Sequence, residues 1–127
     1  MKIIDTEKIP IDSEYEKGFD IRFGVNDATC GAKKIVTGRT FLAPGGKNDP
    51  HYHANSEAVM YIMRGRIRVT AGTGDRKAEY VVGPGSFIYV PPGEVHGIVN
   101  DSDSEPADWI FMYPGVPNKE AAGTIIL

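Results

Sequence analysis

Apolar and polar residues alternate along much of this chain. In residues 18–25 an apolar side chain occurs at every odd position from Phe19 to Val25, and polar residues or glycine lie between them. Successive side chains of an extended strand point to opposite faces, so this pattern predicts a half-buried strand.

Further short segments have the same pattern or are apolar runs of strand length. They span residues 35–42, 58–63, 66–70, 78–82, 87–90, 94–99 and 108–113. Glycine- and proline-containing turns such as 43–46, 72–75, 83–85 and 91–93 separate them, and no helical period persists. Regularly spaced short strands predict an all-β fold, a sandwich or barrel.

The 127 residues are enough for one domain with a core of its own. Residues 1–17 are mixed in polarity and interrupted by Pro10, so they predict either an N-terminal arm or an edge strand. Residues 114–127 are expected to form a C-terminal tail.

Composition excludes several partners. The chain is 41% hydrophobic and 24% charged with a net charge of −3, which argues against nucleic-acid binding. The basic residues of segment 64–68 alternate with apolar ones, as on the solvated face of a strand. No apolar run approaches membrane-spanning length, and the N-terminus lacks the apolar core of a signal peptide. A cytoplasmic protein without nucleic-acid or membrane partners is expected.

All three histidines lie between residues 45 and 100. His51 and His53 are two apart and would share one face of a strand, while Glu57 follows closely. A returning strand would bring His96 to the same point. Three imidazoles and one carboxylate suit a divalent first-row metal. The single cysteine, Cys30, allows neither an intramolecular disulfide nor a thiolate cluster.

The spacing of these residues resembles that of the cupin superfamily. Its second motif, G-x5-P-x-G-x2-H-x3-N, is matched without a gap by Gly85, Pro91, Gly93, His96 and Asn100. The resemblance implies a small jelly-roll barrel, the double-stranded β-helix.

The first cupin motif, G-x5-H-x-H-x3-4-E-x6-G, is matched by Gly45, His51, His53 and Glu57. Gly65 then follows after seven residues, where six are usual. The longer form of the motif would place Ala58 at the ligand position. We therefore expect a bulge or a shifted turn beside Glu57.

The predicted metal ligands are His51, His53, Glu57 and His96. A six-coordinate ion held by these residues would keep two positions open, which favours iron(II) or manganese(II) and leaves nickel, cobalt and zinc as alternatives. The predicted function is that of a metal-dependent oxygenase or oxidase acting on a small chelating substrate, such as a diketone, enediol, catechol or oxo acid.

Two other function classes stay open. One is a non-oxidative isomerase, lyase or decarboxylase for a small acid or sugar, and the other is a barrel that binds a small ligand without turnover. Oxygen consumption separates the first class from the second, and ligand binding without product formation identifies the third. Fold alone decides nothing, because cupins host many chemistries.

Resemblance to other cupins and strand alternation suggest four residues lining the pocket: Thr40, Leu42, Tyr61 and Met63. The aromatic stripe of Trp109, Phe111 and Tyr113 is expected to belong to the core or a dimer interface. Many small cupins dimerise, and strand 19–25 and the apolar end 125–127 suit a homodimer interface.

Overall fold

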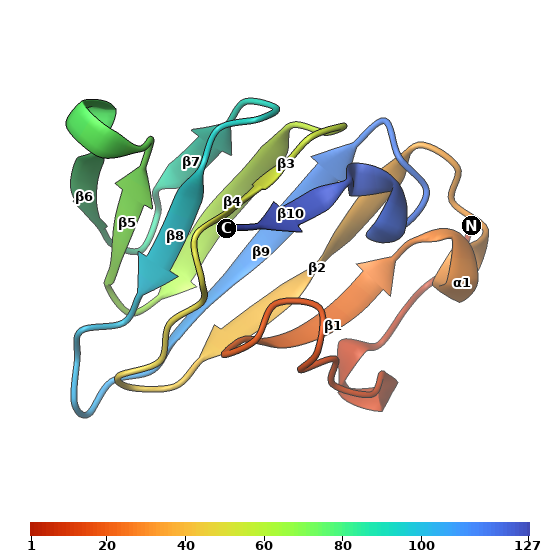
Figure 1. Ribbon diagram of the computed structural model, residues 1–127. Helices are drawn as coiled ribbons and strands as arrows, with labels where there is room; N and C mark the ends of the chain where they lie inside the picture. Colours follow the sequence, from red (N-terminus) through yellow and green to blue (C-terminus); the bar gives the residue numbers. More distant parts are fainter.

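The computed structural model describes residues 1–127 and consists of two antiparallel β-sheets that face each other (Figure 1). In spatial order, the first sheet contains β1 (Asp20–Val25), β2 (Ile35–Leu42), β9 (Ala107–Pro114), β4 (Ala58–Arg64) and β7 (Phe87–Val90). The second contains β10 (Thr124–Ile126), β3 (His51–His53), β8 (His96–Val99), β5 (Ile67–Ala71) and β6 (Ala78–Val82). This arrangement confirms the predicted jelly-roll β-barrel.

Helical structure is confined to short pieces between strands. They are η1 (Thr6–Lys8), α1 (Asp27–Cys30), η2 (Gly74–Arg76) and η3 (Glu120–Ala122). None of the helices has the length and apolar character needed to cross a membrane.

The core lies between the two sheets, where the alternating apolar residues meet. Strand β9 buries Trp109, Phe111 and Tyr113 to at least 95% on one face. Phe19 and Phe23 pack edge-on against Trp109 and Phe111, with ring centroids 5.2 and 5.5 Å apart. The aromatic stripe therefore belongs to the protein's own core.

Tyr61 and Met63 were predicted to face the barrel interior, but they lie on the outer face of β4. Ala58, Met60 and Ile62 are buried, whereas Tyr61 is 36% exposed and packs against Phe87 on the outer surface. The alternation starts from Ala58, the first residue of β4, rather than from Glu57. This shift of one residue exchanges the two faces of the strand.

The turn between β3 and β4, residues 54–57, carries Glu57 on the surface. A second irregularity lies at the far end of β4, where pairing with β9 shifts between Ile62 and Arg64. It precedes Gly65, whose φ is +81° and where an added Cβ would lie 2.4 Å from the Pro106 carbonyl oxygen. The bulge expected beside Glu57 is therefore found at the other end of β4, because pairing with β7 is regular from Ala58 to Tyr61.

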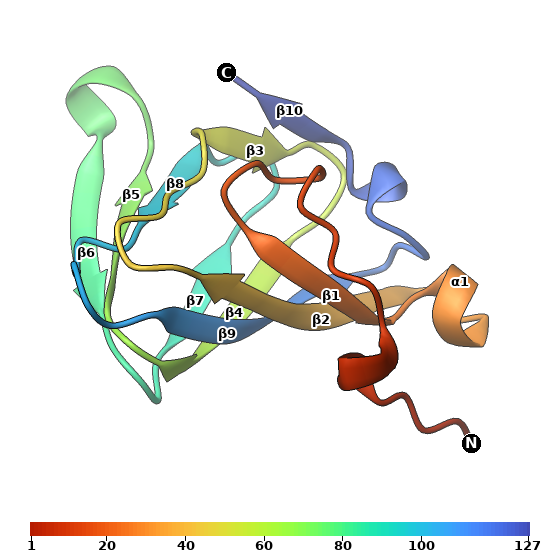
Figure 2. The same ribbon diagram turned by 90° about the horizontal axis from the view of Figure 1, so that it is seen from below.

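The N-terminal arm and the C-terminal strand β10 both reach β3. Residues 1–17 form an arm that contains no strand but pairs once with β1, through hydrogen bonds between Asp12 and Ile21 of 2.7 and 2.9 Å. In Figure 2 the arm loops over β1 toward β3. The C-terminal tail includes β10, which the sequence did not predict, and β10 pairs with β3 and leaves Ile125 and Ile126 exposed.

Candidate metal centre

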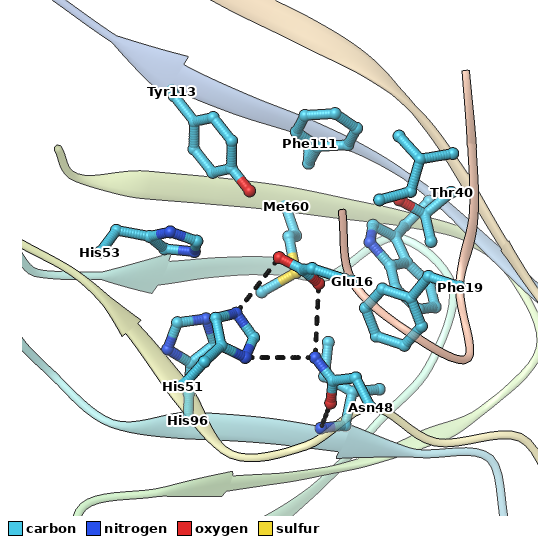
Figure 3. Close-up of a pocket in the computed structure, with 13 residues that line it drawn as sticks. Glu16, Phe19, Thr40, Asn48, His51, His53, Met60, His96, Phe111 and Tyr113 are labelled. Carbon is cyan, nitrogen blue, oxygen red and sulfur yellow. Dashed lines mark hydrogen bonds and ion pairs between the residues drawn. The ribbon is translucent and has the colours of Figure 1, made fainter. Parts of the chain in front are cut away.

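The three histidines come together inside the barrel (Figure 3). Strand β3 supplies His51 and His53 on one face, and His51 is paired directly with His96 of β8. All three side chains are at most 4% exposed, and one ring nitrogen from each lies within 4.8 Å of the others. A cluster of converging imidazoles in a buried position is the arrangement expected of a metal site.

Backbone carbonyls orient two of these rings. Nδ1 of His51 lies 3.0 Å from the carbonyl oxygen of Asp49, and Nδ1 of His96 lies 3.0 Å from that of Glu94. A carbonyl oxygen only accepts, so both Nδ1 atoms carry the proton and donate it. The Nε2 atoms then offer their lone pairs, as metal-ligating histidines do.

His53 is oriented from the C-terminal strand instead. Its Nδ1 lies 2.8 Å from the hydroxyl of Thr124 on β10, and that hydroxyl lies 2.5 Å from the hydroxyl of Tyr15 on the N-terminal arm. Thr124 can accept from His53 while donating to Tyr15, which again leaves Nε2 of His53 free as a ligand. Both termini of the chain thus support the site.

A buried carboxylate outside both motifs completes the cluster. Glu16 on the arm is 8% exposed, and its Oε1 lies 3.2 Å from Nε2 of His51. Its Oε2 accepts a hydrogen bond of 3.4 Å from Nδ2 of Asn48, whose own Oδ1 accepts from the Ile98 amide at 2.8 Å. Glu16 therefore faces the histidines with a defined orientation.

The pKa values reflect this pairing of charges. Burial raises the pKa of Glu16, but His51 outweighs that effect and holds it below its usual value. Burial likewise lowers the pKa of His51, and Glu16 outweighs it and raises the pKa. In the absence of a metal, Glu16 is therefore a carboxylate and His51 is an imidazolium, and the two form a charged pair.

The other two imidazoles stay neutral near pH 7. Burial, together with the nearby positive charge of His51, lowers the pKa of His53 to about 4. The same two causes lower the pKa of His96. Neutral imidazole is the form that binds metal, so these two ligands need not release a proton first.

The residues fit a divalent metal ion. The three imidazoles present lone pairs to one point, and Glu16 supplies a negative charge that offsets part of the ion's charge. Nε2 of His51 is buried without a hydrogen-bond partner, because the Glu16 oxygen beside it is not aligned for a hydrogen bond. A buried ring nitrogen without a hydrogen-bond partner is costly, and a metal ion bound to Nε2 in place of its proton would remove that cost.

The space enclosed beside the cluster is about 20 Å³, enough for roughly one water molecule. Its walls are mostly apolar and include Phe19, Met60, Ile98 and the three aromatic residues of β9. Of the residues predicted to line it, Thr40 does so. Leu42 is fully buried but does not line it, and Tyr61 and Met63 lie on the opposite face of β4.

Glu57 is not brought to the histidines. Its side chain is exposed in the turn before β4 and accepts a hydrogen bond of 2.7 Å from the hydroxyl of Tyr89. Ala58 follows as the first inward residue of the strand, 3% exposed. The inward position at the start of β4 therefore carries a methyl group instead of a carboxylate.

Sequence reasoning missed Tyr15, Glu16, Asn48 and Thr124. Glu16 lies in a polar segment without periodicity, and Thr124 lies in a strand of three residues. The one available signal is Gly18 close behind Glu16, because glycine permits the positive φ of +96° found there.

Comparison with known proteins supports the fold. The chain resembles the polyketide cyclase RemF from Streptomyces resistomycificus, with a TM-score of 0.74 and 25% identity over 90% of this chain and 79% of that one. It also resembles an oxalate decarboxylase from Lactobacillus farciminis, with a TM-score of 0.79 and 19% identity, covering 95% of this chain and 34% of that chain.

Curated relatives match parts of the chain. A germin-like protein 3-5 of Oryza sativa is 35% identical over 56% of this chain and 33% of the relative, and a glucose-6-phosphate isomerase of Thermococcus onnurineus is 34% identical over 80% and 50%. The chain thus spans between a third and a half of these relatives' length. The family model described as a cupin domain matches residues 38–113, and this chain therefore belongs to the cupin family.

Proposed function

We propose that this cupin is a metal-dependent enzyme that uses one divalent ion held by His51, His53 and His96. The observation that carries the proposal is the convergence of three buried imidazoles whose Nδ1 atoms are each engaged elsewhere. A histidine that only supports the fold does not need its second ring nitrogen to point toward two other histidines.

Iron(II) or manganese(II) is the ion we favour. The donors are imidazole nitrogen with carboxylate oxygen nearby and no thiolate, a set that suits these ions. When bound, such an ion supplies Lewis-acid activation of a chelating pair of oxygen atoms and a redox partner for dioxygen. The proposed reaction is oxidation of a small chelating substrate, as in an oxygenase or oxidase.

The residues around the cluster support this chemistry by excluding water and offering few hydrogen bonds. Phe19, Met60 and Trp109 provide apolar walls. Burial, with the negative charge of Glu16, raises the pKa of Tyr113 well above its usual value. Its hydroxyl therefore stays protonated near pH 7 and can donate a hydrogen bond to a substrate oxygen.

A second candidate is non-oxidative chemistry at the same ion, such as cyclisation, isomerisation or decarboxylation. The similarity to a polyketide cyclase over most of both chains favours this alternative, as does the partial match to glucose-6-phosphate isomerase. Both reaction classes use a metal-bound pair of oxygen atoms on the substrate, so they share one site.

Elemental analysis of protein purified without added metal or a metal-affinity tag tests the proposal. Close to one iron or manganese ion per chain is expected, with loss of most metal from a folded His96→Ala variant. Oxygen uptake with diketones, catechols and 2-oxo acids then supports oxidation, and product formation without oxygen uptake supports the second candidate. Absence of metal, with none taken up on titration, would reject both and leave a ligand-binding barrel.

A further inference from the structure

We propose that Glu16 of the N-terminal arm is the carboxylate ligand of this metal centre, in place of the acidic residue of the first cupin motif. This inference rests on the proposed metal site and identifies its fourth protein ligand. It also makes the arm part of the metal centre, although the arm lies outside the matched family region of residues 38–113.

No acidic side chain of the first motif reaches the histidines. Ala58 occupies the inward position at the start of β4, and Glu57 is held on the surface by Tyr89 at 2.7 Å. Bringing Glu57 to the histidines would require a shift of one residue in β4, which would expose Met60 and Ile62 to solvent. The fold therefore excludes Glu57 from the cluster.

Glu16 lies at the distance from His51 that two ligands of one ion would have. Two donors bound at right angles to one ion, each at about 2.1 Å, lie about 3.0 Å apart. The separation between Oε1 of Glu16 and Nε2 of His51 is 3.2 Å. Since these two atoms are not aligned for a hydrogen bond with each other, they are placed as neighbouring ligands of a shared cation.

Burying the Glu16 carboxylate requires a positive charge beside it. Glu16 is more than nine-tenths buried, and its side chain contacts Nε2 of His51 at 3.2 Å and Nδ2 of Asn48 at 3.4 Å but forms no ion pair with a lysine or arginine. A divalent ion at the cluster would supply the charge that offsets the buried carboxylate.

The arm is built to deliver Glu16 there. Oδ1 of Asp12 accepts hydrogen bonds from the amides of Glu14 and Tyr15 at 2.9 and 3.0 Å, and Asp12 also forms an ion pair with Lys119. Behind Glu16, the chain turns at Gly18, where a Cβ would lie 1.9 Å from the carbonyl oxygen of Lys47. Anchors on both sides therefore fix the carboxylate over the histidines.

The test compares Glu16→Gln with the matched control Glu57→Gln. Manganese(II) affinity is measured by calorimetry and by the electron paramagnetic resonance of the free ion. Glu16→Gln is expected to bind manganese at least about tenfold more weakly, since even partners that only orient a ligand cost 10–100-fold. Glu57→Gln is expected to bind within about twofold of the unchanged protein.

A second readout follows the arm itself. Hydrogen exchange of the Tyr15 and Glu16 amides is expected to slow when manganese binds to the unchanged protein, but not in Glu16→Gln. If Glu16→Gln does not fold, Glu16→Asp keeps the charge but withdraws the carboxylate by one methylene, and the same loss of affinity is expected.

The outcomes separate the two proposals. If Glu16→Gln or Glu16→Asp binds manganese as tightly as the unchanged protein while His96→Ala loses it, the metal site stands and the role of Glu16 is overturned. If Glu57→Gln weakens binding instead, the motif carboxylate is the ligand. If the unchanged protein binds no manganese, iron, cobalt, nickel or zinc, the proposed function falls together with this inference.

Discussion

The hydroxyl of Thr124 lies 2.8 Å from Nδ1 of His53 and thereby connects the last strand of the chain to the histidine cluster. The same hydroxyl lies 2.5 Å from that of Tyr15 on the N-terminal arm. His51 and His96 are oriented by carbonyls within two residues of themselves, whereas His53 depends on residues distant in sequence. Of the three histidines, His53 is therefore the one whose orienting group can be removed by substituting another side chain.

Replacing Thr124 by Val is expected to weaken metal binding by about 10- to 100-fold, because His53 loses the group that fixes its tautomer and ring orientation. Affinity for manganese or zinc, measured by competition with a chromogenic chelator, checks this prediction. Thr73→Val is the matched control, because Thr73 is exposed and its side chain makes no capping hydrogen bond. Equal affinities in the two variants would contradict the role given to Thr124.

The metal-free protein is expected to lose stability on mild acidification. The pKa of His53 is lowered from 6.5 to about 4 in the folded state, so below pH 6.5 the unfolded chain binds a proton that the folded chain does not. Stability falls as the pH decreases from about 6.5 to about 4, by on the order of 3 kcal/mol from this residue. His96 acts in the same direction, because its pKa is also lowered.

Urea unfolding of metal-free protein between pH 7 and pH 4 measures this effect. His51 has the opposite sign, because its raised pKa gives a stability contribution that is full below pH 6.5 and is lost at higher pH. The variant His53→Asn isolates the contribution of His53, since asparagine does not titrate. A pH dependence identical to that of the unchanged protein would refute the assignment.

Much of the fold was predictable because it depends on local patterns. Every strand of four or more residues overlaps a segment whose alternation or apolar run predicted it. Strand β10 was not predicted, because three residues such as Thr124–Ile126 are too few to establish a period and are held by pairing with β3. The faces of β4 were predicted by counting from Glu57. That choice placed Tyr61 inside the barrel, where the structure has Met60.

The histidines of the site were predictable for a different reason. Their spacing places His51 and His53 on one face of β3, and the second motif aims His96 at the same point. Glu16 and Thr124 reach the cluster through tertiary contacts of the two termini, 35 and 71 residues away from His51 and His53, respectively. No local pattern encodes such contacts, so only the folded structure reveals them.

Gly18 is expected to be more sensitive to substitution than other glycines with positive φ. In Gly18→Ala the new Cβ would lie 1.9 Å from the Lys47 carbonyl oxygen, so the backbone of the arm must move. In Gly31→Ala the φ of +74° is similar, but nothing lies within 4 Å. The control therefore carries only the backbone strain, roughly 1–3 kcal/mol.

Urea unfolding should show a larger loss of stability for Gly18→Ala than for Gly31→Ala, and metal titration should show weaker binding for Gly18→Ala alone. The second effect follows because the turn at Gly18 positions Glu16 over His51. Matching losses of stability with unchanged metal affinity in both variants would show that the turn does not position a ligand.

The vacant motif position offers a test by relocation of the carboxylate. Ala58 faces inward at the start of β4, so Ala58→Glu places a carboxylate where the longer form of the cupin motif has one. In the Glu16→Gln background, Ala58→Glu is expected to recover at least about tenfold in manganese affinity, because the donor set of three imidazoles and one carboxylate is restored. Val59→Glu is the matched control, because it adds the same charge at a position that faces away from the site. Recovery with Val59→Glu alone, or with neither substitution, would show that the site does not need a carboxylate from this side.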